Sequence, residues 1–125
     1  MRLSLPLLLI PTFFVAAGSL NAAVDEAFFK AKVWPIIETS CTGCHGEKKQ
    51  KGKLRLDSKE AWLKGWEDGK IVEPGNPEKS DVITAIKRQM KDADQNMPPK
   101  KDKALSTEQV AIIEEWIKGG MPWGK

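Results

Sequence analysis

The chain has 125 residues, of which 41% are hydrophobic and 30% are charged, and its formal net charge is +3 at neutral pH. This length allows one domain with a modest core, and the small net charge argues against a nucleic-acid-binding protein. Two cysteines and one histidine are too few for a structural zinc site built from cysteine and histidine alone.

Residues 1–23 are predicted to be a secretory signal peptide. A single arginine precedes an almost unbroken apolar run over residues 3–17, and the small residues Ala22 and Ala23 follow it. The run is short for a membrane span. We therefore expect cleavage near Ala22 or Ala23, export to the periplasm and a mature domain over residues 24–125. The alternative is that the segment stays uncleaved and anchors the protein to a membrane.

The first part of the mature chain is predicted to be helical. Asp25 is a candidate N-cap for a helix with apolar residues on one side, and Pro35 breaks or restarts this helix. A brief extended piece is expected over residues 54–56. A short helix follows over residues 58–64 and ends at Gly65.

The segment Cys41-Thr42-Gly43-Cys44-His45 contains every cysteine and the only histidine of the chain. The pattern Cys-x-x-Cys-His is the attachment motif of a c-type haem. Two cysteines three positions apart on a helical turn lie on one face, so Cys41 and Cys44 can form thioethers with the two vinyl groups of one porphyrin. His45 then becomes the proximal ligand of the iron. Because the chain has no second histidine, the distal ligand cannot be a histidine.

Three other interpretations of the cysteine pair remain open. A zinc site would need carboxylate ligands in addition. A thioredoxin-like redox pair normally lies in a βαβ unit, and no such unit is predicted. A disulfide between Cys41 and Cys44 would close too small a loop to stabilise the fold much. Haem attachment is therefore the preferred interpretation.

Two longer helices are predicted in the second half of the chain. The first has Asn76 as candidate N-cap and Pro77 in its first turn, and apolar residues recur at helical spacing as far as Met90. The second begins at Ser106, which fits a capping box with Gln109, and two glycines end it. No alternating pattern predicts a strand. The expected fold class is therefore all-α, a small helical domain wrapped around one covalently bound haem.

The distal ligand is expected to be a methionine, because a neutral thioether favours ferrous iron and suits an electron carrier. Met97 is the preferred candidate, since two prolines stiffen the loop Asn96-Met97-Pro98-Pro99. Met90 and Met121 are the fallback candidates. Met90 is expected on the apolar face of a helix, and Met121 lies just beyond the last helix.

Several segments between about Val33 and Trp123 are similar, in their order, to the planctomycete-type cytochrome c domain. The resemblance implies the fold of the small cytochromes c, and it assigns the distal ligand to the Met-Pro-Pro element, at Met97. Trp66, Asp81 and Met121 depart from the family pattern, so Met121 is a local alternative ligand. The similar segments are Val33-Trp34-Pro35-Ile36, Cys41 to Gly46, Lys51 to Ser58, Pro74 to Ser80, Met97-Pro98-Pro99-Lys100, Trp116-Ile117 and Pro122-Trp123.

The sequence therefore predicts an exported cytochrome c with one haem c and its iron, which carries single electrons between redox partner proteins and is not an enzyme. Lysines gather in residues 48–53 and again in residues 100–103, and each run is either a docking surface for an acidic partner or a solvated loop. Two alternative functions are a peroxidase-like haem enzyme and a haem-based sensor of small ligands. Both require an open coordination position on the iron, for example by displacement of Met97.

Overall fold

The computed structural model describes residues 23–67 and 69–124. These residues form helices, turns and loops and contain no strand, which confirms the expected all-α class. The predicted signal peptide, apart from Ala23, lies outside the described residues. Within the described ranges, no helix has the length and the apolar character needed to cross a membrane.

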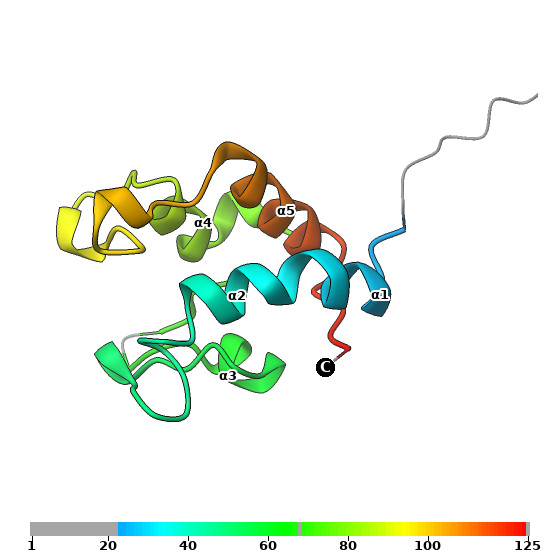
Figure 1. Ribbon diagram of the computed structural model, residues 1–125, viewed down its shortest axis with the longest axis horizontal. Coiled ribbons are helices and arrows are strands. Elements are labelled where there is room, and N and C mark those ends of the chain that lie inside the picture. The colour runs from blue at the N-terminus through cyan, green and yellow to red at the C-terminus, as the bar shows by residue number, and fades with distance from the viewer. Residues whose placement is uncertain (1–22, 68, 125) are drawn as a thin grey trace, which may run out of the picture.

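A continuous helical rod runs along the middle of the molecule (Figure 1). It consists of α1 (Glu26–Phe28), η1 (Phe29–Val33) and α2 (Trp34–Ser40). Asp25 is its N-cap, as predicted, because the Asp25 Oδ1 atom accepts a 2.8 Å hydrogen bond from the amide of Phe28. The section η1 is a π-helical turn. Pro35 has no N–H to donate to the preceding turn, and this wider turn accommodates the loss before α2 begins.

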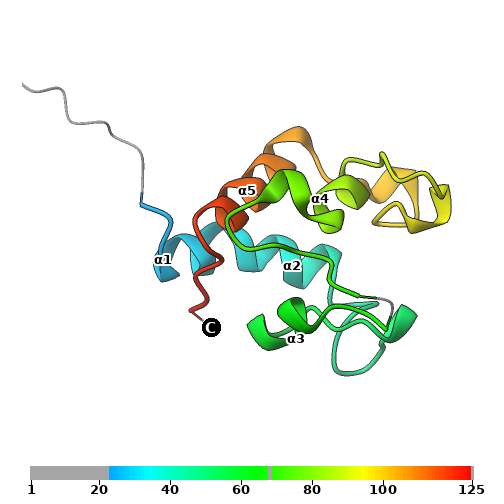
Figure 2. The same ribbon diagram turned by 180° about the vertical axis from the view of Figure 1, so that it is seen from behind.

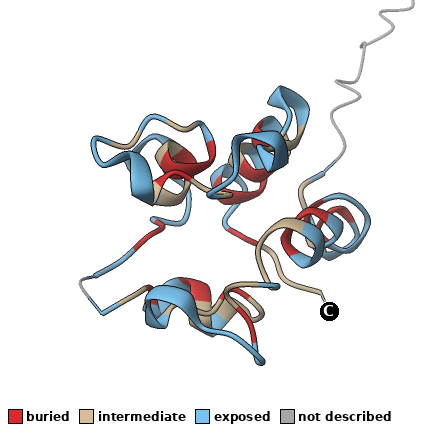
Figure 3. Ribbon diagram, turned by 60° about the vertical axis from the view of Figure 1, so that its left-hand side comes forward, coloured by how far each residue is buried: buried red, intermediate tan, exposed pale blue. Residues whose placement is uncertain are grey.

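Two further groups of elements flank the rod, as Figures 1 and 2 show from opposite sides. One group contains α3 (Lys59–Lys64), which ends at Gly65 as predicted and begins one residue later than predicted, because Ser58 is its N-cap. The other contains α4 (Asp81–Ile86) and α5 (Thr107–Lys118), which pack against each other, and α5 also contacts η1. Figure 3 shows buried segments in all three groups. Short 3₁₀ turns lie in the connecting loops, at Lys51–Lys53, Pro77–Lys79, Ala93–Gln95 and Lys101–Lys103.

The predicted helix from Asn76 to Met90 is wrong in its extent. Its first turn is the separate 3₁₀ turn at Pro77–Lys79, and α4 ends at Ile86. Met90 therefore lies in the loop after α4 and not on an apolar helix face. The helix ends early because Arg88 adopts a left-handed backbone conformation, with φ of 61°.

The last helix, α5, begins and ends as predicted. The Ser106 hydroxyl accepts a hydrogen bond from the amide of Gln109 at 3.1 Å, and the Gln109 side chain accepts one from the amide of Ser106 at 2.9 Å, which completes the capping box. Gly119 caps the other end of the helix. The chain then returns to the N-terminal end of the rod, where the rings of Trp123 and Phe29 lie 4.3 Å apart between centroids.

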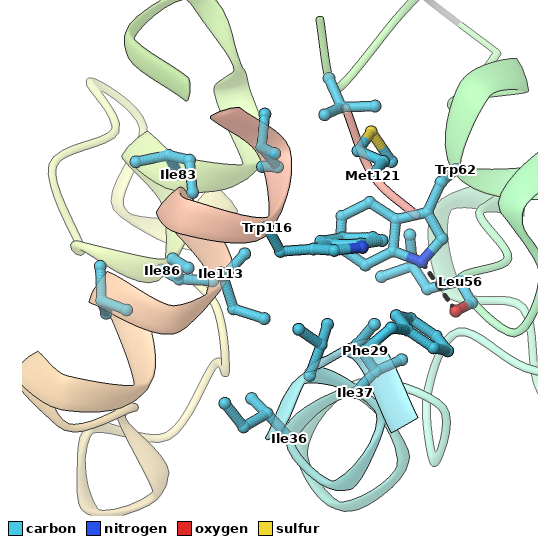
Figure 4. Packing of buried hydrophobic residues seen from close by; sticks show 14 of the residues in the cluster. Phe29, Ile36, Ile37, Leu56, Trp62, Ile83, Ile86, Ile113, Trp116 and Met121 are labelled. Carbon is cyan, nitrogen blue, oxygen red and sulfur yellow. Dashed lines mark hydrogen bonds between the residues drawn. The ribbon is translucent and has the colours of Figure 1, made fainter. Parts of the chain in front are cut away.

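The core is one cluster of buried apolar side chains contributed by all three groups of elements (Figure 4). In this cluster the rings of Trp62 and Trp116 meet edge to face, with centroids 5.1 Å apart. Their indole N–H groups donate to the carbonyls of Leu56 and Pro122 respectively, each at 2.8 Å, so both indoles are packed with their polar atom satisfied. Met121 lies beside these two rings and is fully buried.

Candidate functional site

The cysteine–histidine motif lies where α2 ends. The amide of Cys41 donates to the carbonyl of Ile37 at 2.9 Å, which continues the helical pattern for one more residue. The amides of Cys44 and His45 both donate to the carbonyl of Cys41, at 3.2 and 2.9 Å. The structure therefore brings Cys41, Cys44 and His45 together on a single closed turn.

The loop that follows holds this turn in place. The carbonyl of His45 accepts a hydrogen bond from the amide of Leu56 at 2.8 Å, and the carbonyl of Cys44 accepts one from the amide of Lys51 at 2.9 Å. Gly46 is buried, and a Cβ atom at this position would lie 2.4 Å from the carbonyl oxygen of Thr42. The turn therefore closes in this form only with glycine at position 46.

The environment of the two cysteines bears on the alternatives to haem attachment. Both are free thiols. Burial raises the pKa of the Cys41 thiol to about 12, although the residue keeps part of its surface accessible. A reactive redox cysteine needs a lowered pKa, so the environment of Cys41 disfavours a thioredoxin-like role for this residue. Among the described residues no three His, Cys, Asp or Glu side chains are grouped so as to hold a metal ion, as the zinc interpretation would require.

His45 has the properties of a metal ligand. Burial is the main influence on its imidazole and lowers the pKa, as does the charge of Lys51, while the backbone of Leu54 and Lys51 acts in the opposite direction. A lowered pKa favours the neutral ring, which is the form that binds a metal. Its Nδ1 atom is buried without a hydrogen-bond partner in the described part of the chain. Such an unpaired nitrogen, beside two free thiols, fits a covalently attached haem that takes His45 as iron ligand.

The three candidate methionines differ in their surroundings. Met121 is fully buried in the core cluster, and Met90 is half-buried in the loop after α4. Met97 is half-buried and packs against the core cluster, as Cys41 does. Met97 and Cys41 thus pack against one cluster from two separate segments of the chain. The amide of Met97 donates to the carbonyl of Ala85 in α4, whereas Cys41 is the C-cap of α2.

Two residues that the sequence analysis did not single out support the Met97 segment. Asn96 is buried, and its Oδ1 atom accepts a 3.0 Å hydrogen bond from the amide of Met90. Arg88 donates through Nη1 to the carbonyl of Pro98. The sequence does contain a signal for Asn96, because this asparagine directly precedes the candidate ligand. Arg88 gives no comparable signal, because its role depends on where α4 ends.

A small all-α domain that carries two free cysteines and a histidine on one turn is typical of the c-type cytochromes. Within this class, the family model described as Planctomycete cytochrome C matches residues 41–101. Residues 41–101 therefore belong to a planctomycete-type cytochrome c domain, and within this range the resemblance seen in the sequence is confirmed. The family implies covalently bound haem with its iron and a role in electron transfer. No curated protein and no solved structure matches the chain.

Proposed function

We propose that this protein is a periplasmic monohaem cytochrome c that carries one electron at a time. In this proposal Cys41 and Cys44 form the thioethers, His45 is the proximal ligand and Met97 is the distal ligand. The observation that carries it is the turn at the end of α2, where two free thiols lie beside a histidine with a buried, unpaired Nδ1 atom. The family match, which begins at Cys41, supports the same assignment.

The haem, when bound, supplies a one-electron couple between ferric and ferrous iron. The residues of the chain determine how the haem is held and how its environment influences the couple. Two covalent bonds from one turn prevent loss of the cofactor, and the apolar core excludes water. A methionine sulfur is a neutral donor, so Met97 as ligand favours the reduced state and raises the reduction potential. These properties suit a carrier of electrons, whereas a haem enzyme needs an open coordination position.

The surroundings of the methionines support Met97 over its rivals. The amide of Met97 donates to the carbonyl of Ala85 at 3.0 Å, which fixes its backbone on α4, and its side chain packs against the core cluster. Met121 already fills part of the core beside Trp62 and Trp116 (Figure 4). An axial ligand must hold in both oxidation states with little rearrangement, so an anchored segment suits this role.

A Met97→Ala variant of the holoprotein tests the proposal. We expect it to lose the weak long-wavelength ferric band that reports iron–sulfur bonding, and to have a lower reduction potential than the wild type. Its reduced form should bind carbon monoxide rapidly, whereas the reduced wild type should bind it slowly. Met90→Leu and Met121→Leu remove the sulfur and nearly conserve the volume, so these matched controls should keep the band.

Other outcomes of these measurements would contradict the proposal. Persistence of the band in Met97→Ala, with its loss in one leucine variant, would move the distal ligand to Met90 or Met121. Rapid carbon monoxide binding by the wild type would favour a haem enzyme or a haem-based sensor. More than one iron per chain by elemental analysis would contradict a monohaem protein, and recovery of the holoprotein outside the periplasmic fraction would contradict the location.

The lysines support a further part of the proposal, a docking surface for an acidic redox partner. The two segments that carry them, residues 48–53 and 100–103, lie at the end of the molecule where α2 ends, as both views of the fold show (Figures 1 and 2). Positive charges gathered at one end of a molecule steer an acidic partner to that end. The surface, which we call the lysine end, consists of the exposed residues Lys48, Lys49, Lys51, Lys53, Lys100, Lys101 and Lys103.

A further inference from the structure

Arg88, which follows the C-terminal end of α4, has a backbone conformation that glycine usually adopts. Arg88 has φ of 61°, in the left-handed region that residues with a Cβ atom rarely adopt. Its amide donates to the carbonyl of Ala85, and the amide of Gln89 donates to the carbonyl of Thr84, both at 3.0 Å. This pair of hydrogen bonds is the Schellman motif, in which glycine usually occupies the left-handed position.

The other α-helix of the C-terminal half, α5, ends with the same motif and has the usual residue. Gly120, after α5, occupies the left-handed position with φ of 90°. Its amide donates to the carbonyl of Ile117, and the amide of Met121 donates to the carbonyl of Trp116, both at 3.0 Å. A helix end of this kind therefore does not need an arginine side chain. The reason for Arg88 lies in what its side chain contacts.

The side chain of Arg88 reaches the segment that contains the proposed distal ligand. Its Nη1 atom donates to the carbonyl of Pro98, the residue after Met97. Two more hydrogen bonds hold the same segment. The amide of Met97 donates to the carbonyl of Ala85, and the buried Asn96 side chain accepts from a backbone amide of the loop after α4, each at 3.0 Å. Three consecutive residues are thus each bound to α4 or to the loop that follows it.

We propose that Arg88 is a positioning residue for the distal ligand, because its hydrogen bond to Pro98 holds the Met97 segment against α4. This inference rests on the proposed function, in which Met97 is that ligand. A thioether is a weak ligand of iron. The more the chain segment that carries it can move after release, the smaller the fraction of time that the sulfur stays bound. Loss of the Arg88 hydrogen bond gives the segment more freedom, and Met97 then leaves the iron more often. The left-handed backbone of Arg88 goes together with a guanidinium that reaches the carbonyl of Pro98.

The holoprotein variant Arg88→Gly separates this role from a structural one. Glycine keeps the helix end and relieves the backbone strain, which offsets the lost hydrogen bond, so the melting temperature should stay close to the wild-type value. We expect the reduced variant to bind carbon monoxide roughly tenfold faster than the wild type, the factor that loss of one hydrogen bond from a charged donor predicts. The long-wavelength ferric band should weaken in parallel.

Lys87→Ala is the matched control. Lys87 is also a cation at the C-terminal end of α4, but it pairs with Glu114 and not with the Met97 segment. This variant should leave the carbon monoxide rate and the ferric band unchanged. Equal effects of the two substitutions, or wild-type behaviour of Arg88→Gly, would overturn the positioning role. Failure of the proposed function itself is recognised separately, because Met97→Ala would then keep the ferric band.

Discussion

Gly46 shows how a single residue limits the geometry of the candidate site. A methyl group at this position would lie 2.4 Å from the carbonyl oxygen of Thr42, so Gly46→Ala forces the turn to open. We expect the variant to lower the free energy of unfolding of the holoprotein by roughly 1–3 kcal/mol, as other overpacked sites do. Denaturant titration of the purified holoprotein measures this quantity.

Gly43 is the natural control, because it belongs to the same turn and an added Cβ atom there has nothing within 4 Å. Gly43→Ala should change the free energy of unfolding by less than about 0.5 kcal/mol. If the two variants were equally stable, the close approach at Gly46 would not limit the turn.

The local part of the site follows from the sequence, and the rest does not. Cys41, Cys44 and His45 share a turn because helical spacing is a property of the chain segment itself. The unpaired Nδ1 atom of His45 could not be predicted, since it depends on residues that pack around the ring from elsewhere in the chain. The same holds for the hydrogen bond from Arg88 to the residue after Met97, which requires both the end of α4 and the path of the following loop.

At the scale of elements, the capping box of α5 is the clearest test of local stability. Ser106→Ala removes the hydroxyl that accepts a hydrogen bond from the amide of Gln109. We expect a loss of about 1 kcal/mol in the free energy of unfolding, which corresponds to roughly 4–8 °C in Tm for a domain of this size. Thermal unfolding followed by circular dichroism measures the shift. Thr107→Ala, one residue later and also exposed, should leave Tm nearly unchanged or raise it slightly.

Helix boundaries in this chain could be predicted where a side chain caps them. Asp25, Ser58 and Ser106 each accept a hydrogen bond from a backbone amide three residues later, and short-range patterns of this kind are visible in the sequence. The end of α4 could not be predicted in the same way. Arg88 ends the helix in a left-handed conformation that arginine rarely adopts, so its residue type gave no sign of a helix end. The apolar spacing alone therefore suggested a helix as far as Met90.

At the scale of the whole molecule, the sequence does not predict how the three groups of elements are arranged around one core. Apolar spacing predicted a helix in the region of α4, but it did not indicate that Trp62 and Trp116 would meet edge to face. That contact joins residues far apart in the chain, and such contacts depend on the packing of all elements together. The fold class was predictable because it follows from the elements alone.

The same arrangement places both lysine runs at one end of the molecule, where we propose that an acidic partner docks (Figure 1). Attraction between exposed charges is screened over about 10 Å at 0.1 M salt, so electron transfer to an acidic acceptor should slow as ionic strength rises. We expect the double variant Lys49→Glu with Lys101→Glu to lower the second-order rate constant at low salt by about tenfold and to flatten its salt dependence. Stopped-flow absorption of the haem measures this rate.

The control for this prediction uses two lysines outside the lysine end. Lys30 lies in η1 and Lys118 is the last residue of α5, and both are exposed. The double variant Lys30→Glu with Lys118→Glu produces the same change in net charge, so it separates the position of the charges from their sum. If net charge alone governed association, both double variants would slow electron transfer equally. Because local charge steers the encounter, we expect the control to keep most of the wild-type rate and salt dependence, and an equal loss in both variants would contradict docking at the lysine end.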